Sequence, residues 1–411
     1  MKKDTNEQKV IQMYDVIIIG AGPAGLAAAI SCRENDLQTL VLDEFPEIGG
    51  RLLGQLHQEP SGEWWNGIKE TNILKERAFE LDTEIRLGVS VYHIEKTDEG
   101  FIVHTPEATI ETENVLIATG AAESAAPVPG WTLPGVMSIG AAQVMTNVHR
   151  VKVGEKGIVV GVNVLSAAIA RELQLAGIDL HSMVLPVQNA VTKDHAHPQK
   201  VMDGLVRIAH LAPSAFLRFG SKFAKASSLI RKTAVKFYPN NGVKMWGMPI
   251  HVRKAITHIN GNEKVESVTI SNVTTKGEVI QGTEETVDVD FVCIAGGLYP
   301  LAELAAVVGC PTQYVESLGG HVPIHNEKME TPLEGLYVAG NITGIESAKV
   351  ARVQGTVAGL SIAKRKAKKP AKLEKQIKQA MADVRKTREN ASIQFHPGIE
   401  EGRNMMYKEQ G

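Results

Sequence analysis

The stretch from Tyr14 to Glu44, YDVIIIGAGPAGLAAAISCRENDLQTLVLDE, decides the fold of this chain. It opens with a β-branched apolar run and breaks at Gly-Ala-Gly-Pro-Ala-Gly. Small apolar residues at helical spacing follow, and a second apolar run, TLVLD, closes the stretch. This order predicts one β-α-β unit.

The glycines of this unit each have a physical task in a dinucleotide site. Gly20 permits a tight turn, Gly22 lets a pyrophosphate approach the backbone, and Gly25 lets the helix lie close to the strand. Asp43 ends the second strand, where a carboxylate accepts hydrogen bonds from a ribose 2′-OH. We therefore predict a dinucleotide site here, the alternative being a glycine turn with a structural role alone.

A second stretch, KGIVVGVNVLSAAIARELQLAG from Lys156 to Gly177, has the same order of strand, turn and helix. Its turn reads GVNVLS, so Asn163 and Ser166 stand where two of the glycines are expected. Side chains there occupy the space that a pyrophosphate and the helix need. Val184 lies as far beyond Gly161 as Asp43 lies beyond Gly20, so it stands where the ribose carboxylate is expected. We predict a nucleotide-type fold that no longer binds NAD(P), with an intact NAD(P) site as the alternative.

Composition limits the remaining possibilities. A chain of 411 residues with 43% hydrophobic residues is long enough for two domains, and a net charge of -2 gives no general attraction to nucleic acid. Cys32, Cys293 and Cys310 are scattered, which argues against a disulfide framework, a redox dithiol, a zinc site or an iron–sulfur cluster, so we expect no metal. No apolar run reaches the ~20 residues of a membrane span. We expect a cytoplasmic protein.

Two further segments favour FAD over NAD as the dinucleotide. ETENVLIATGA, residues 111–121, is an apolar strand that ends in a turn of small residues. In residues 331–363 a strand ends at Gly340-Asn341 and a helix rich in small residues follows. Together with the first unit, this pattern resembles the two-dinucleotide-domain flavoprotein oxidoreductases, the superfamily of thioredoxin reductase and glutathione reductase.

That resemblance implies where an extended FAD lies. Asn341 is expected near the ribityl chain or the pyrophosphate, and the helix from about Ala348 is expected to point its N-terminus at the flavin pyrimidine. The superfamily usually has Asp at the position of Asn341, so the polar contact is uncharged in this chain.

Four segments carry a narrower resemblance. They are GGRLLGQLH (49–57), GAAESAAPVPGWTLPGVMSIGAAQ (120–143), CIAGGLYPLAELAAVVGC (293–310) and GGHVPIHNEKMETPLEGLYVAGNITG (319–344). They resemble the FAD-dependent alpha-type subunits of bacterial and archaeal amino-acid and amine dehydrogenases. This group includes the B subunit of hydrogen cyanide synthase, the A subunit of opine oxidase, dye-linked proline dehydrogenase alpha and the sarcosine oxidase alpha-like proteins.

The narrower resemblance implies an FAD-dependent oxidoreductase subunit that serves a small amino acid or a secondary amine. Its expected partner is a second flavoprotein subunit of the D-amino-acid-oxidase type, and its electrons pass to a quinone or a carrier protein. Two alternatives stay open: an NAD(P)H-dependent flavin reductase, and a non-catalytic electron-relay or assembly subunit. No nucleic-acid partner is expected.

Candidate site residues follow from these motifs. Those expected to bind FAD are Gly20, Gly22, Pro23, Ala24, Gly25, Asp43, Glu44, Gly50, Arg51, Val91, Ala118, Thr119, Gly120, Gly340, Asn341, Ala348, Lys349 and Val350. His57 is a candidate proton relay, Glu123 a candidate holder of a substrate amine, and Lys349 a candidate stabiliser of negative charge on reduced flavin. The alternatives are a hydrogen-bonded loop histidine, a surface or interface glutamate, and an exposed helix lysine.

The expected fold class is α/β, with two Rossmann-like dinucleotide-binding domains, the second inserted in the first. The FAD domain comprises residues 1–121 and 290–370, and the NAD(P)-binding-like domain comprises 122–289. Residues 371–411 form a C-terminal tail with a charged helix, roughly Pro370 to Arg388, and then an irregular end.

A basic insert, residues 204–262, contains no Asp or Glu. Its first part mixes Phe216, Phe219 and Phe223 with Lys and Arg at near-helical spacing. Three interpretations stay open: a helical lobe that packs on its own domain, a surface that docks an acidic partner protein, and peripheral contact of residues 204–238 with the inner face of the membrane.

Overall fold

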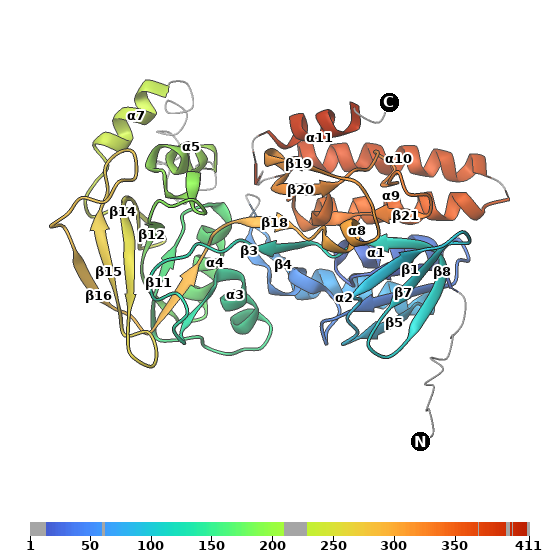
Figure 1. Cartoon of the computed structure of the whole chain (residues 1–411), viewed down its shortest axis with the longest axis horizontal. Helices are drawn as coiled ribbons and strands as arrows, with labels where there is room; N and C mark the ends of the chain where they lie inside the picture. Colours follow the sequence, from blue (N-terminus) through green and yellow to red (C-terminus); the bar gives the residue numbers. More distant parts are fainter. Residues whose placement is uncertain are drawn as a thin grey trace, which may run out of the picture. The chain divides into compact units, whose positions relative to one another are not determined.

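The computed structural model describes residues 14–59, 62–208, 228–368, 370–391, 395–396 and 398–408. The chain divides into two compact units (Figure 1). Unit 1 consists of Met1–Leu53, Asn66–Ala122 and Leu298–Gly411, and unit 2 consists of Gly54–Trp65 and Glu123–Gly297.

The sheet of unit 1 has the strand order β5-β2-β1-β8-β7-β6, with β21 also paired to β8. The strands are β1 (Tyr14–Ile19), β2 (Thr39–Asp43), β5 (Glu84–Leu87), β6 (His93–Lys96), β7 (Phe101–His104), β8 (Thr109–Ile117) and β21 (Leu336–Val338). β1 runs parallel to β2 and β8, and β21 runs parallel to β8. The segments that follow these parallel strands therefore emerge at one edge of the sheet.

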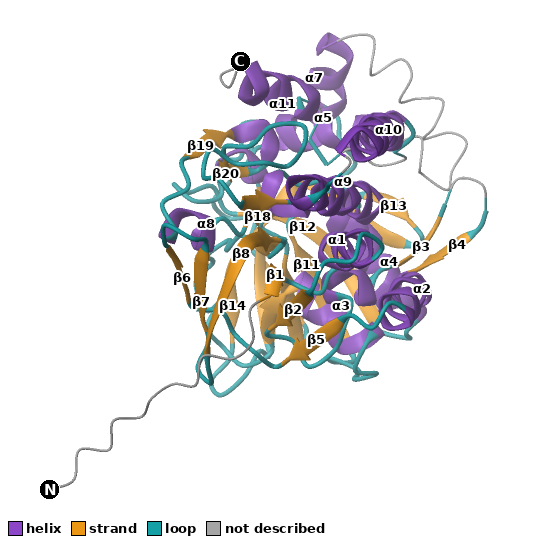
Figure 2. Cartoon of the chain, turned by 90° about the vertical axis from the view of Figure 1, so that its right-hand side faces the viewer, coloured by secondary structure: helices purple, strands orange, loops and turns teal. Residues whose placement is uncertain are grey.

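Unit 1 also contains helices. They are α1 (Pro23–Arg33), α2 (Gly67–Glu80), α8 (Glu303–Val307), α9 (Ala348–Lys366), α10 (Pro370–Glu389) and α11 (Ile399–Lys408), with 3₁₀ turns η1 (Gly50–Gly54), η4 (Glu316–Leu318) and η5 (Gly340–Thr343). Figure 2 shows α1, α9 and α10 stacked on one another. α1 and α9 approach closely because α9 has glycine at the contact: a Cβ at Gly355 would lie 2.0 Å from the carbonyl oxygen of Ala24.

Short strands complete unit 1. β19 (Thr312–Val315) pairs with β20 (Gly320–Pro323), and β18 (Leu298–Pro300) pairs with β9 (Ala121–Glu123). α11 packs Ile399 and Met406 against a small core that includes Leu318. The expected helix of the C-terminal tail is present as α10. The expected irregular end is wrong, because α11 forms there.

Unit 2 holds a second sheet, in the order β10-β17-β11-β12-β14-β15-β16, with β13 paired to β14. Its strands are β10 (Val136–Ser138), β11 (Lys156–Val160), β12 (Asp179–Pro186), β13 (Val243–Met245), β14 (Met248–Asn260), β15 (Ser267–Asn272), β16 (Glu285–Asp288) and β17 (Phe291–Ile294). The run from β10 to β14 is parallel, as a nucleotide-type fold requires. The predicted fold class is confirmed.

The helices of unit 2 are α3 (Ile139–Asn147), α4 (Val164–Leu175), α5 (Pro198–Ile208) and α7 (Ser228–Lys236), with the 3₁₀ turn η2 (Lys193–Ala196). A hairpin of β3 (Leu56–Gln58) and β4 (Trp64–Asn66) belongs to this unit over residues 54–65. The N-terminal part of the chain, which the sequence assigns to the FAD domain, thus contributes this hairpin to unit 2. The predicted domain boundaries stay a prediction.

The basic insert is only partly described. β13 and β14 belong to the central sheet, so residues 243–260 are integral to the unit and not an appendage. Arg231 donates to Asp203 at 2.7 Å, and Lys254 pairs with Glu285 at 2.7 Å. Phe216, Phe219 and Phe223 lie outside the described residues. Within the described part of the chain, no helix is long and apolar enough to cross a membrane.

Candidate functional site

The first turn of the candidate site begins at Gly20. Its φ is +109°, and its N–H donates to the carbonyl oxygen of Leu42 at 2.8 Å. A Cβ here would lie 2.4 Å from the carbonyl oxygen of Ala118, at the end of β8. Glycine is therefore required for β1 to turn beside its neighbour.

The start of α1 is open. Gly22 is the N-cap residue, and no side chain accepts a hydrogen bond from the first N–H groups of the helix. A Cβ at Gly22 would have no atom within 4 Å, whereas a Cβ at Gly25 would lie 1.8 Å from the carbonyl oxygen of Gly20. Uncapped N–H groups thus face free space at a helix N-terminus, which is the arrangement that binds a phosphate. Pro23 and Ala24 form the first turn of this helix.

Asp43 lies at the end of β2 and holds the turn in place. One of its carboxylate oxygens accepts from the N–H of Ala21 at 2.5 Å, and the other accepts from the N–H of Phe45 at 2.8 Å. A carboxylate has about four acceptor positions, so these two bonds leave room for a ribose hydroxyl. Gly50 adjoins the same turn, since a Cβ there would lie 3.5 Å from the Cα of Gly22.

The remaining predicted cofactor residues of unit 1 differ in how they are held. The side chain of Thr119 donates to the carbonyl oxygen of Leu301 at 2.8 Å, and Gly120 has φ +77° with free space beside it. Val91 is half-buried, in the segment after β5, and packs against a core cluster. Glu44 and Arg51 are exposed.

The segment after β21 reaches the same edge of the sheet. The N–H of Gly340 donates to the side chain of buried Gln354 at 3.0 Å, and the side chain of Asn341 accepts from the N–H of Glu346 at 3.2 Å. α9 then begins at Ala348 and includes Lys349, which is exposed. Unit 1 thus gathers the first turn, Asp43, the turn after β8, Gly340–Asn341 and the start of α9 at one sheet edge.

The second turn closes on itself. Gly161 also has φ +109°, but the side chain of Asn163 accepts from the N–H of Ser166 at 2.9 Å. The hydroxyl of Ser166 in turn accepts from the N–H of Asn163 at 2.9 Å, which completes a capping box, and Ser166 is fully buried. The donors that would hold a phosphate at α4 are therefore engaged by the chain's own side chains.

The structure corrects the residue that matches Asp43 in unit 2. Leu42 receives the hydrogen bond from the first glycine of unit 1, and Val184 receives the corresponding bond in unit 2. The position after Val184 is Leu185, which is fully buried. The sequence prediction chose Val184 because it lies as far beyond Gly161 as Asp43 lies beyond Gly20. The second unit is one residue longer between its glycine and this strand, so the match moves to Leu185. The matching residue is still apolar, so no ribose carboxylate is present at this position.

The other candidate catalytic residues lie in unit 2. The Nε2 atom of His57, on β3, lies 3.6 Å from a carboxylate oxygen of Glu59. Glu123 accepts from the N–H of Gly140 at 2.9 Å and from the hydroxyl of Ser138, so it caps the start of α3. The structure thus shows a structural task for Glu123, and the catalytic roles of His57 and Glu123 remain proposals.

The cysteines do not form a redox pair. Cys32, Cys293 and Cys310, the three cysteines of the chain, are buried and form no disulfide with one another. Burial raises the pKa of each thiol, that of Cys310 to about 11. A buried protonated thiol is a poor nucleophile, so thiol chemistry has no support in this fold.

The structure contains two clusters around buried charged side chains that the sequence did not predict. Buried Glu172 on α4 accepts from the backbone N–H of Leu56 at 3.3 Å and from the side chains of Gln143 and Asn147 at 2.8 and 2.6 Å. Burial raises the pKa of this carboxyl to about 7. The other cluster joins Glu346 to two arginines of the C-terminal helices. No motif signals either one, because their members are far apart in the chain. A Glu inside an otherwise apolar helix face was the available clue to Glu172.

The fold and the site define a flavoprotein of the two-dinucleotide-domain type. Comparison with known proteins places the chain more narrowly: residues 14–355 match the pyridine nucleotide-disulphide oxidoreductase family model, and the chain belongs to that family. It is therefore an oxidoreductase with a flavoprotein fold.

Individual relatives agree with this assignment. The chain is 27% identical to the A subunit of opine oxidase from Agrobacterium tumefaciens (strain Ach5) over 368 residues, covering 85% of this chain and 65% of that protein. It is 21% identical to the HcnB subunit of hydrogen cyanide synthase from Pseudomonas protegens over 359 residues, covering 84% and 69%. The chain spans 65% and 62% of the length of two opine oxidase A subunits that it matches.

Solved structures share the fold. L-proline dehydrogenase from P. horikoshii superposes with a TM-score of 0.63 at 21% identity, covering 92% of this chain and 61% of that one. Thioredoxin reductase from T. acidophilum gives 0.60 at 20% identity, covering 86% and 99%. The predicted family resemblance is confirmed.

Proposed function

We propose that the chain is the FAD-binding subunit of an amino-acid or secondary-amine dehydrogenase whose electrons go to a quinone or a carrier protein. One observation carries the proposal: the turn at α1 is open to a phosphate, whereas the turn at α4 is closed by Asn163 and Ser166. A reductase that draws electrons from NAD(P)H needs both turns. The names of the opine oxidase and cyanide synthase relatives, each a subunit of a larger enzyme, support a hetero-oligomer.

FAD, when bound, would accept the two electrons that are released when the C–N bond of an amine is oxidised to an imine. Within the chain, the N–H groups at the start of α1 would hold the pyrophosphate, and Asp43 would hold a ribose hydroxyl. The N-terminus of α9 would stabilise negative charge at the flavin end. Lys349, exposed beside that terminus, would add a positive charge.

The direct test is anaerobic stopped-flow spectroscopy of the purified holoprotein. NADH, NADPH, proline and sarcosine are mixed with it in turn, with and without its co-purified partner. We expect amine to bleach the flavin with the partner present, and neither NADH nor NADPH to do so. Rapid bleaching by NAD(P)H would contradict the proposal, and a flavin inert to every donor would favour an electron relay. Release of the cofactor and chromatography against FAD and FMN standards checks its identity.

A further inference from the structure

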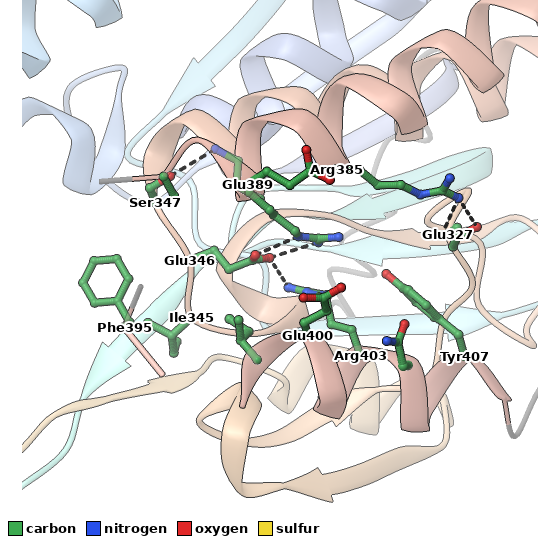
Figure 3. A pocket seen from close by; sticks show the side chains of 15 residues that line it. Glu327, Ile345, Glu346, Ser347, Arg385, Glu389, Phe395, Glu400, Arg403 and Tyr407 are labelled. Carbon is green, nitrogen blue, oxygen red and sulfur yellow. Dashed lines mark hydrogen bonds and ion pairs between the residues drawn. The ribbon is translucent and has the colours of Figure 1, made fainter. Parts of the chain in front are cut away.

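A cavity of about 190 Å³ lies in unit 1, outside the elements of the nucleotide fold that hold Asp43 and the first turn. Its walls come from residues 345–347 and the first turn of α9, from the last turns of α10, and from one face of α11 (Figure 3). A cavity of about 150 Å³ is able to hold benzene. This one therefore has room for a ligand of somewhat more than six heavy atoms.

Buried charge forms one wall of the cavity. Arg388 donates through Nε and Nη2 to the two carboxylate oxygens of Glu346, at 2.8 and 3.0 Å. Arg403 donates through Nη2 to the same carboxylate and, at 3.3 Å, to Thr343. Burial alone would raise the pKa of Glu346, but the charges of Arg403 and Arg388 outweigh it and hold that pKa below its ordinary value. Two guanidinium groups thus share one carboxylate, so the cluster of Glu346, Arg388 and Arg403 has a net charge of about +1.

Arg403 has donors to spare. Its side chain is 3% exposed, and its Nε and Nη1 atoms have no hydrogen-bond partner among the described residues. Nearby His325 stays neutral, since burial and the charge of Arg403 lower its pKa to about 3, so Arg403 is the charged group at this point. Leaving these two buried donors without acceptors is costly. Such donors suit a carboxylate, because an ionised oxygen accepts a short, charge-assisted hydrogen bond from a guanidinium N–H.

The rim of the cavity has the opposite charge. Glu389 and Glu400 line it and are exposed, and neither carboxylate has an ion-pair or hydrogen-bond partner among the described residues (Figure 3). Ile345, Phe395 and Ile399 supply apolar wall. A phosphate or a dicarboxylate would be repelled at this rim. A cationic group a few ångströms from a carboxylate would be attracted.

We infer that this cavity binds a small amino acid as a zwitterion. The carboxylate lies on Arg403, the ammonium faces Glu389 and Glu400, and a compact apolar body rests on Ile345, Phe395 and Ile399. The choice of an amino acid among zwitterions rests on the proposed function. Ser347 and Val350, at the start of α9, also line the cavity, so the ligand lies beside the proposed flavin end of the cofactor site.

Isothermal titration of the full-length holoprotein tests the charge pattern. The probes are L-proline, cyclopentanecarboxylate, which lacks the amine, and pyrrolidine, which lacks the carboxylate. We expect proline to bind, and each analogue to bind about tenfold more weakly or worse, because it loses one charge-assisted contact. Equal affinities for the three probes, or no binding of proline, would overturn the inference.

Variants locate the binding. Glu400→Gln changes an exposed side chain, so the fold is kept, and we expect about tenfold weaker proline binding with cyclopentanecarboxylate unaffected. The matched control is Glu401→Gln, an exposed neighbour on α11 that does not line the cavity; its affinity should equal that of wild type. Arg403→Lys keeps the charge but loses the unpartnered Nε and Nη1 donors, and should abolish proline binding. Normal proline affinity in Glu400→Gln sinks the inference, even if Arg403→Lys fails to fold.

The outcome is separable from that of the proposed function. If proline reduces the flavin equally well in wild type and Glu400→Gln with the same affinity, this site is wrong and the dehydrogenase proposal stands. If proline binds with the expected variant effects and no amine reduces the flavin, the site stands and the dehydrogenase proposal fails.

Discussion

The turns at Gly20 and Gly161 share one backbone. Both glycines have φ +109°, and both N–H groups donate at 2.8 Å to the neighbouring strand. A Cβ at either one would lie 2.4 or 2.3 Å from a carbonyl oxygen at the end of a third strand. The first glycine of such a turn is therefore required by the fold, and its presence says nothing of a nucleotide.

The turns differ in what satisfies the helix that follows. At α1 the N–H groups have no side-chain cap and face free space beside Gly22. At α4 Asn163 and Ser166 cap the helix reciprocally. The start of α4 is thus satisfied without a nucleotide, because side chains supply the acceptors that a phosphate would.

The largest effect should come from Gly25→Ala. Its Cβ would lie 1.8 Å from the carbonyl oxygen of Gly20, so α1 must move off the sheet. We expect a loss of about 4 kcal/mol in the free energy of unfolding and no bound flavin. Thermal unfolding and flavin absorbance measure both. A stable, flavin-loaded variant would show that the close approach is not needed.

Gly22→Ala separates binding from folding. The backbone at Gly22 has φ −75°, which alanine adopts readily, and no atom lies within 4 Å of the added Cβ. The methyl group instead meets the pyrophosphate. We expect an unchanged melting temperature of the apoprotein and about 100-fold weaker FAD binding by fluorescence titration. Unchanged FAD affinity would remove the pyrophosphate from this turn.

Glu172 should make stability depend on pH. Its pKa is raised by burial to about 7, so the folded state keeps a proton that the unfolded state releases near its ordinary value of 4.5. Stability should fall as pH rises from about 4.5 to about 7, by about 3 kcal/mol, and stay low above that range. Glu172→Gln should remove this pH dependence in urea unfolding series. A wild-type stability that rises over this range would contradict the assignment.

The smallest effect concerns the capping box. Asn163→Ala should destabilise the start of α4 by about 1 kcal/mol, which speeds amide hydrogen exchange there about fivefold and leaves α1 and flavin content unchanged.

In the double variant Asn163→Gly, Ser166→Gly, we expect no tight NADH binding, because Leu185 still replaces the ribose carboxylate. Tight NADH binding by this double variant would show that the two glycines alone are enough for a nicotinamide nucleotide to bind.

The sequence predicted the fold where one local pattern decides it. Glycine spacing, β-branched runs and small-residue helices identified both β-α-β units, and strand order then brought Gly20, Asp43 and Gly340 to one edge. The resemblance to alpha-type dehydrogenase subunits rested on proline and glycine at unusual spacings, such as Pro127 to Gly135, and the similarity to opine oxidase A and HcnB subunits agrees with it.

What the sequence did not predict depends on contacts between distant residues. The β3–β4 hairpin joins unit 2 through the bond between Leu56 and Glu172, which no local pattern reports. The sequence predicted an irregular end where α11 forms, and α11 contains Gly402. That glycine is needed where the helix touches Ser317, since a Cβ there would lie 2.1 Å from the hydroxyl. The cavity of unit 1 likewise requires α10 and α11 to be in place first.

The central claim is that the chain has one working dinucleotide turn, and nucleotide titration of the full-length apoprotein tests it most directly. Calorimetry with FAD, and then with NADPH and NADH on the FAD-loaded protein, gives the number of sites. The account predicts one FAD per chain, weakened in Gly22→Ala, and no saturable heat from either nicotinamide nucleotide. Saturable NADPH binding that persists in Gly22→Ala would place a working site in unit 2 and contradict the account.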